Sequence, residues 1–206
     1  MDNPILKIIP IISLVAFVAL HCGTKWSRYP IGIVIGLILS AIGDSCLVYI
    51  RDPSYFVKGI IAFLCAQLVY TVTFGFRRFK PYILICCIIV GSSIYFYIFP
   101  QLKTETVYLI AIYDVLLFLM TWRALSRVHL EKPGSILCGL GAISFIISDL
   151  TLGLVITEHI PPNEFIIMAT YYAAQFGIAM SVIDLYTDEE SEWVDLENPS
   201  FKMKRP

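Results

Sequence analysis

The chain has 206 residues, and 58% of them are hydrophobic, against about 45–50% in soluble domains. Its mean hydropathy is +0.78 and its formal net charge is −1, so bulk electrostatics give no support for nucleic acid as a partner. Because the apolar residues lie in long runs, the composition indicates a polytopic membrane protein and excludes an ordinary soluble domain.

A membrane-spanning helix needs about 20 mainly apolar residues. By that rule the sequence predicts an all-α transmembrane bundle with seven spans, at residues 5–21, 30–50, 57–76, 81–99, 105–123, 135–157 and 164–186. Residues 1–186 are therefore expected to form one helical domain. A charged cytoplasmic tail, 187–206, follows and is expected to be disordered.

Lysine and arginine are divided unevenly between the two sets of connections. The tail and the loops after the first, third and fifth spans carry Lys25, Arg28, Arg77, Arg78, Lys80, Arg123, Arg127, Lys132 and three tail cations. The opposite set carries only Arg51, Lys58 and Lys103, with Lys7 near the start of the chain. The positive-inside rule predicts that the first set is cytoplasmic, so the N-terminus faces the lumen or the exterior.

Two aspartates lie inside apolar spans, Asp44 in the second and Asp149 in the sixth. A carboxylate near the middle of a bilayer costs at least ~2.5 kcal/mol, and such acids commonly mark functional sites. From the helical rise per residue, both lie roughly 9–12 Å below the non-cytoplasmic interface. The alternative is a structural role, in which each acid only hydrogen-bonds a neighbouring helix.

Polar residues of four other spans fall at a similar depth and are expected to bind substrate. They are Lys7, Gln67, Tyr70, Tyr113, Tyr172 and Gln175, and Tyr171 joins the same layer. Polar groups from six spans in one layer indicate a pocket. For the tyrosines, packing in the core or at the membrane interface is an equally good explanation. Asp114 is expected to point elsewhere. Lys7 is either a cation that extends to the interface or the partner of an acid or a lipid phosphate.

The pair of acids suggests a chemistry. Two carboxyl groups in one cavity titrate apart, so that one is protonated while the other is ionised. That division suits acid–base hydrolysis of an ether-type bond. Neither a metal nor a cofactor is expected, because the six cysteines lack zinc or redox spacing and no serine-hydrolase, zinc-peptidase or P-loop motif is present.

Small residues recur every four positions before the first acid, at Gly32, Gly36 and Ser40. One face of this helix is therefore expected to pack closely against a neighbour. Since Gly-x-x-x-Gly also occurs in helix dimers, a homodimer is the alternative to packing within the bundle.

The sequence also carries a faint internal duplication. Gly43-Asp44-x-x-Leu47 is followed by Gln67, and Ser148-Asp149-x-x-Leu152 is followed by Gln175. The second and third spans would then correspond to the sixth and seventh, with the same orientation.

Taken together, these residues resemble the lysoplasmalogenase (YhhN-like) family of integral membrane proteins. The matching segments are Leu6-Lys7-Ile-Ile-Pro10, Ala41-Ile-Gly-Asp44, Ala66-Gln-Leu-Val-Tyr70 to Gly75, Met120-Thr-Trp-Arg123-Ala124, Gly141-Ala-Ile-Ser-Phe-Ile-Ile-Ser-Asp149-Leu and Thr170-Tyr-Tyr-Ala-Ala-Gln175. The resemblance covers residues 5–186. It implies an endoplasmic reticulum enzyme of lipid metabolism that hydrolyses the vinyl-ether bond of lysoplasmalogens, which are ether lipids.

The products implied by this resemblance are a fatty aldehyde and glycerophosphoethanolamine or glycerophosphocholine, and the essential acids would be Asp44 and Asp149. The chain departs from the family at two points: members usually have eight spans, so this chain would follow that plan without its first helix, and several have histidine where this chain has Gln67. The competing interpretations are a proton-coupled transporter and a non-catalytic lipid-binding membrane protein.

Overall fold

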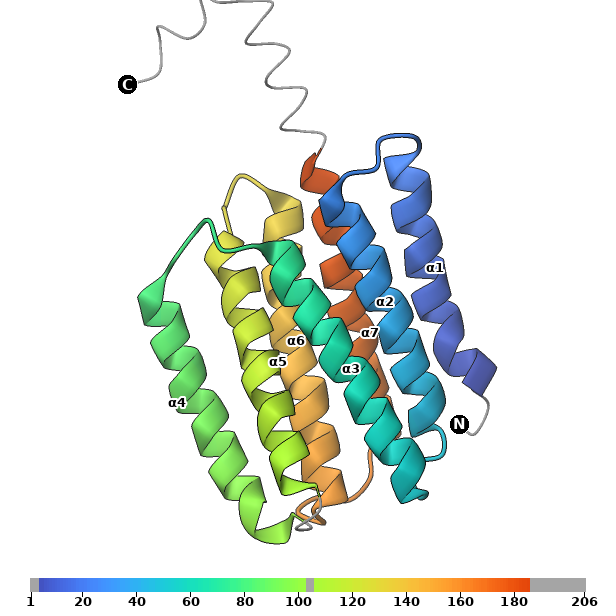
Figure 1. Cartoon of the computed structure of the whole chain (residues 1–206), viewed down its shortest axis with the longest axis vertical. Coiled ribbons are helices and arrows are strands. Elements are labelled where there is room, and N and C mark those ends of the chain that lie inside the picture. The colour runs from blue at the N-terminus through green and yellow to red at the C-terminus, as the bar shows by residue number, and fades with distance from the viewer. Residues whose placement is uncertain (1–3, 103–105, 186–206) are drawn as a thin grey trace, which may run out of the picture.

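The computed structural model describes residues 4–102 and 106–185, and within those ranges all regular structure is helical (Figure 1). The α-helices are α1 (Pro4–Cys22), α2 (Arg28–Leu47), α3 (Pro53–Phe74), α4 (Pro81–Ile98), α5 (Val107–Arg127), α6 (Pro133–Ile156) and α7 (Glu164–Met180). Short 3-10 turns, Phe99–Gln101 and Ser181–Ile183, extend α4 and α7. The predicted all-α bundle is confirmed, while the predicted tail, 187–206, lies outside the described residues.

Six of these helices, α2 to α7, are long and apolar enough to cross a membrane. The apolar stretch of α1, Lys7–Cys22, is shorter, although α1 packs against α2 and α7 as a member of the bundle (Figure 1). The number of spans is therefore close to the seven predicted.

Local sequence signals place the helix boundaries. Proline stands in the first turn of α3, α4 and α6, where its missing N–H would have no intrahelical partner. The start of α3 was predicted four residues too late, because hydropathy alone ignores its cap. Asp52 accepts a hydrogen bond from the Ser54 backbone N–H at 2.8 Å, so the helix begins at Pro53. Gly75, with φ of +70°, ends α3.

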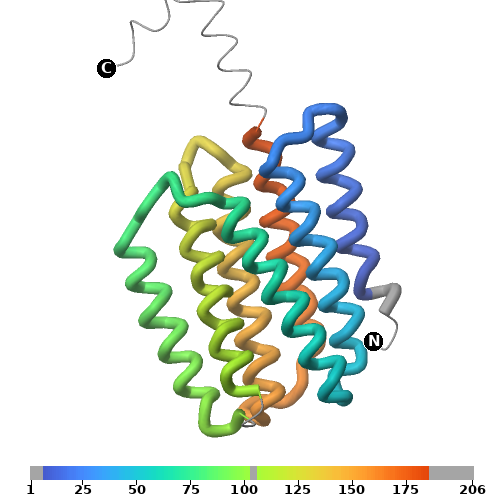
Figure 2. The backbone as a smooth tube through the Cα atoms, in the orientation of Figure 1, coloured from blue at the N-terminus to red at the C-terminus, as the bar shows by residue number. Residues whose placement is uncertain are grey.

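The packing of the helices follows the predicted duplication. The two most closely packed pairs are α2 with α3 and α6 with α7. Helix α1 packs against α2 and α7, and α5 packs in the same way against α6 and α3. Helix α4 lies at the edge of the bundle against α5 (Figure 2). The order of neighbours around α1 therefore repeats around α5.

Glycines permit the close approach within both pairs. A Cβ atom on Gly36 would lie 2.1 Å from the Tyr70 ring of α3, and one on Gly32 would collide with Thr73. The stripe of small residues on α2 is thus covered by α3, as expected for packing within the bundle, and is not free for a second copy of the chain. In the other pair, a Cβ on Gly141 would lie 2.7 Å from the Ala174 carbonyl oxygen of α7.

The connections after α1, α3 and α5 lie at one end of the bundle, together with the end of the described chain (Figure 1). Most of the described lysines and arginines gather there. The connections after α2, α4 and α6 lie at the opposite end, where the described part of the chain begins at Pro4. We call this second end the acid end, since it is nearer to Asp44 and Asp149.

Candidate functional site

A cavity of about 440 Å³ lies within the acid end of the bundle. Its wall contains residues of α2 to α7 and Lys7 of α1, and it extends to the loops that join α2 to α3 and α6 to α7. The volume is within the range of small-molecule sites, and most lining residues are apolar. Both features are typical of a pocket that takes a largely apolar ligand with a few polar groups.

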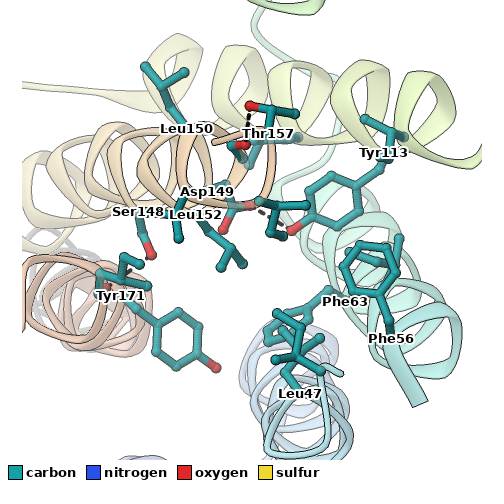
Figure 3. A pocket seen from close by; sticks show the side chains of 18 of the residues that line it. Leu47, Phe56, Phe63, Tyr113, Ser148, Asp149, Leu150, Leu152, Thr157 and Tyr171 are labelled. Atoms are coloured by element: carbon teal, nitrogen blue, oxygen red, sulfur yellow. Dashed lines mark hydrogen bonds between the residues drawn. The ribbon is translucent and has the colours of Figure 1, made fainter. Parts of the chain in front are cut away.

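The structure brings the two predicted acids into this one cavity. The Tyr171 hydroxyl of α7 donates a hydrogen bond to Asp44 Oδ2 at 2.8 Å, and the Tyr113 hydroxyl of α5 donates to Asp149 Oδ2 at 2.5 Å. Figure 3 shows Asp149 with Tyr113, and Tyr171 facing the same space. The carboxyls are close enough to repel each other when both are ionised. Each acid, Asp44 on α2 and Asp149 on α6, is therefore held by a tyrosine from another helix.

Each carboxyl keeps one oxygen for a ligand. Among the described residues, Asp44 and Asp149 each accept a hydrogen bond through Oδ2 only. Since a carboxyl group has two oxygens and about four acceptor positions, Oδ1 of each acid can still meet a substrate or a water molecule. The tyrosines fix the orientation of both groups through Oδ2 and do not use Oδ1.

Lys7 also lines the cavity, as predicted. Its backbone carbonyl accepts a hydrogen bond from the Tyr172 hydroxyl at 3.1 Å, which ties α1 to α7. Its ammonium group attracts the Asp44 carboxylate electrostatically. The role of Tyr172 in this arrangement is to hold α1, because its side chain is not part of the cavity wall.

Three of the predicted substrate-binding residues lie behind the wall and not in it. Gln67, Tyr70 and Gln175 are fully buried, and the Tyr70 hydroxyl donates to Gln175 Oε1 at 2.9 Å. The amide of Gln67 lies beside the Tyr113 hydroxyl, and that of Gln175 lies beside the Tyr171 hydroxyl. They form a buried polar layer that backs the two tyrosines, so any influence on a ligand would pass through those tyrosines.

Several wall residues were not singled out from the sequence. Asp114 was expected to point elsewhere, and it lines the cavity. Arg51, Asn163 and Glu164 line the end of the cavity at the loops; their position at the same end of the predicted bundle was the available signal. Phe63 lies edge-on to Tyr171, with ring centroids 5.9 Å apart.

Part of the cavity wall is apolar. It includes residues of α4, α5 and α6: Ile94, Ile98, Leu117, Phe118 and Ile146. Such a surface fits a hydrocarbon chain. Among the described residues, no group of three or more His, Cys, Asp or Glu side chains could hold a metal ion.

Comparison with known proteins gives consistent matches. The model of the YhhN family matches residues 3–182. A protein named "Lysoplasmalogenase TMEM86A" from Bos taurus is 32% identical over 189 residues, which are 88% of this chain and 78% of that protein. The human "Lysoplasmalogenase TMEM86B" is 31% identical over 185 residues, 87% of this chain and 74% of that protein. The Sus scrofa protein of the same name is 34% identical over 180 residues, with 86% and 74% covered. No solved structure gives a significant match.

Proposed function

The chain belongs to the YhhN family, and from this membership and the cavity geometry we propose that it is a membrane hydrolase that cleaves the vinyl-ether bond of lysoplasmalogens. The products would be a fatty aldehyde and glycerophosphoethanolamine or glycerophosphocholine. The observation that carries the proposal is that Asp44 and Asp149, from separate helices, line one cavity with apolar walls. The substrate would be drawn from the surrounding membrane lipids.

The two acids supply the proton donor and the proton acceptor that this reaction needs. Two carboxyl groups in a low-dielectric cavity resist being ionised together, so the pair carries one proton. In the first step the protonated acid gives its proton to the vinyl carbon that is not bonded to oxygen. The carbon–carbon double bond supplies the electron pair, and the other vinyl carbon becomes an oxocarbenium ion. The ionised acid stabilises this cation.

Water then completes the hydrolysis. A water molecule attacks the oxocarbenium carbon and gives its proton to the ionised acid, which forms a hemiacetal. In the collapse, the hemiacetal hydroxyl returns a proton to the first acid, and the glycerol oxygen leaves with a proton from the second. The net reaction consumes one water molecule and regenerates both acids.

The remaining predicted residues have positions that fit this reaction. The apolar wall on α4, α5 and α6 would hold the alkenyl chain, and Lys7 at the acid end can meet the phosphate. Tyr113 and Tyr171 would hold the acids, while Tyr172 holds α1. Gln67, Tyr70 and Gln175 would support the tyrosines from behind and not touch the substrate.

We further propose that the protein resides in the endoplasmic reticulum membrane with the acid end toward the lumen. The support is the gathering of cations in the connections after α1, α3 and α5, which the positive-inside rule assigns to the cytoplasm. An N-glycosylation acceptor added before Met1 should be glycosylated in microsomes, and one inserted between Glu131 and Lys132 should not.

The direct test of the proposed activity is aldehyde release by the purified protein in lipid nanodiscs. A lysoplasmalogen should yield a fatty aldehyde, while the saturated 1-alkyl analogue and a 1-acyl lysophospholipid should not, because neither has a vinyl carbon to protonate. Asp44→Asn and Asp149→Asn should each lower kcat by at least ~10²-fold while the purified proteins keep their thermal transition. Absence of aldehyde from the unaltered protein, or full activity in both variants, would refute the proposal.

A further inference from the structure

The two acids have different electrostatic surroundings. Asp44 experiences the positive charge of Lys7, whereas the groups that act on Asp149 are the tyrosine that donates to it and, through mutual repulsion, Asp44 itself. This difference is not visible in the sequence, where both acids follow a small residue within an apolar span.

The geometry of α7 explains why the lysine lies at Asp44. Tyr171 donates to the Asp44 carboxylate and its neighbour Tyr172 donates to the Lys7 backbone carbonyl. The rings of these tyrosines lie 5.5 Å apart between centroids. Adjacent residues of one helix therefore hold the acid of α2 and the start of α1 side by side, and the lysine side chain enters the cavity there.

The other charged or titratable groups do not remove this asymmetry. Asp44 is faced by Lys7 from α1, Tyr70 from α3, Tyr113 from α5, Asp149 from α6, and Tyr171 and Tyr172 from α7. The remaining charged residues in the cavity wall are Arg51, Asp114 and Glu164. Arg51 and Glu164 are exposed at the loops, where water screens them. Lys7 is thus the cation that distinguishes one acid from the other.

We propose that Lys7 holds Asp44 as the carboxylate, so that Asp149 is the acid that protonates the vinyl carbon. This assignment rests on the proposed function. Lys7 is then a positioning residue that acts through Asp44. A neighbouring opposite charge favours the ionised form of a carboxyl group, and this effect is larger in a cavity of low effective dielectric constant than in water.

The assignment gives each proton a path. Asp149 transfers its proton from Oδ1, because Oδ2 is held by Tyr113. The carboxylate of Asp44 stabilises the oxocarbenium ion and then accepts the proton of the attacking water. When the hemiacetal collapses, the hemiacetal hydroxyl returns a proton to Asp149, and Asp44 gives its proton to the departing glycerol oxygen. Both acids return to their starting states.

The first test is the pH dependence of kcat for Lys7→Met, Lys7→Arg and the unaltered protein. Activity falls at low pH as the carboxylate becomes protonated, so loss of the neighbouring cation should move this acidic limb to higher pH by about one unit. Lys7→Arg should restore the original limb, because the arginine keeps the charge. Neither substitution removes the Tyr172 bond, which uses the backbone carbonyl.

Lys58→Met is the matched control. Lys58 also lies at the acid end, but its ammonium group packs over the Tyr55 ring at 5.0 Å from the centroid, outside the cavity wall. This variant should keep the pH profile of the unaltered protein. An equal shift in Lys58→Met would show that the effect is a general loss of surface charge and would overturn the proposal.

A second measurement separates this role from phosphate binding. A 1-alkenylglycerol has the vinyl ether but no phosphate. If Lys7 acts through Asp44, Lys7→Met should shift the acidic limb equally for this substrate and for lysoplasmalogen. A rise in KM for the phosphate substrate alone, with no shift in either profile, would show that the lysine only binds phosphate.

The residual activity of the acid variants completes the test. The activity of Asp149→Asn should no longer decline at high pH, and it should increase toward low pH, because only hydronium can then protonate the vinyl carbon. Asp44→Asn should instead lose the acidic limb. The reverse pattern would overturn the assignment and leave the hydrolase intact, whereas the absence of aldehyde from the unaltered protein would refute the hydrolase itself.

Discussion

Asp44 and Asp149 at one end of the bundle and Arg123 at the other are ionisable residues within apolar helices, but their hydrogen bonding differs. Arg123 is fully buried; its Nε donates to the Gly75 carbonyl at 2.6 Å and its Nη1 donates to the Arg78 carbonyl at 2.7 Å. The guanidinium also packs on the rings of Phe76 and Trp122. Each acid has one tyrosine as a donor and keeps an oxygen toward the cavity.

This difference is the one expected between a structural charge and a catalytic one. Arg123 fastens the connection between α3 and α4 onto α5, and the Trp122 indole N–H adds a hydrogen bond to the Lys80 carbonyl at 3.1 Å. Two of its five N–H groups donate to backbone carbonyls and two aromatic rings pack on it, while Nη2 is buried without a hydrogen-bond partner among the described residues. The acids are held in place but left incompletely bonded beside a space large enough for a ligand. A costly intramembrane charge with open bonding positions beside a cavity is the one expected to perform chemistry.

The largest expected effect comes from the acids. Asp149→Asn should lower kcat by roughly 10²- to 10⁴-fold, the usual contribution of a positioned general acid. Its thermal transition should remain close to that of the unaltered protein, because asparagine can still accept from Tyr113. Aldehyde release and thermal unfolding should be measured on the same preparation. If the variant stayed active but unfolded at lower temperature, the acid would have a structural role, as Arg123 does, and the account would be contradicted.

The opposite result is expected for Arg123→Met. The loss of two hydrogen bonds from a charged group should lower the free energy of unfolding by about 3 kcal/mol. The kcat of the folded fraction should not change, since the residue lies outside the cavity wall. Arg77→Met, at an exposed position of the same connection, is the control and should unfold as the unaltered protein does. A selective loss of kcat in Arg123→Met would contradict the structural role.

A smaller effect is expected from the tyrosines that hold the acids. Tyr113→Phe and Tyr171→Phe each remove one hydrogen bond to a carboxyl and should lower kcat about tenfold. Tyr70→Phe removes a buried hydrogen bond to Gln175 that involves neither acid. It should reduce thermal stability and leave kcat nearly unchanged. Equal loss of kcat in all three variants would indicate that the polar layer acts as one unit with the tyrosines.

The smallest expected effect concerns a charge at the acid end that is used only for folding. Asp52→Ala removes the hydrogen bond from the Ser54 N–H that caps α3 and should cost about 1 kcal/mol of stability. Activity per folded molecule should be unchanged. Asp52→Asn, which can still cap the helix, should recover most of the stability, and a failure to do so would show that the effect is one of charge.

The sequence predicted the helices well, because they depend on the spacing of apolar residues along the chain. The direction in which each side chain points around its helix axis was harder to predict. Gln175 lies one turn beyond Tyr171, and Gln67 lies one turn beyond Phe63, so each glutamine shares the face of a wall residue but lies deeper than the cavity. Tyr172, one position after Tyr171, turns toward α1 instead.

Arg123 illustrates another limit. Next to Trp122, it has the sequence pattern of an ordinary cation at the membrane interface. Its burial depends on a loop that folds back and places the carbonyls of Gly75 and Arg78 beside it. No sequence pattern near Arg123 predicts these acceptors. The difference between Asp44 and Asp149 arises in the same way, since it depends on how α7 positions the start of α1.

The central claim is that the acid pair protonates a vinyl carbon, and hydrolysis in D₂O tests it most directly. The unaltered protein should release an aldehyde that carries one deuterium at carbon 2, with kcat lower than in H₂O, and early trapping by borohydride would prevent exchange. Asp149→Asn should form this product at least ~10²-fold more slowly. An aldehyde without deuterium at carbon 2, or equal deuterium-labelled product from Asp149→Asn, would contradict the account.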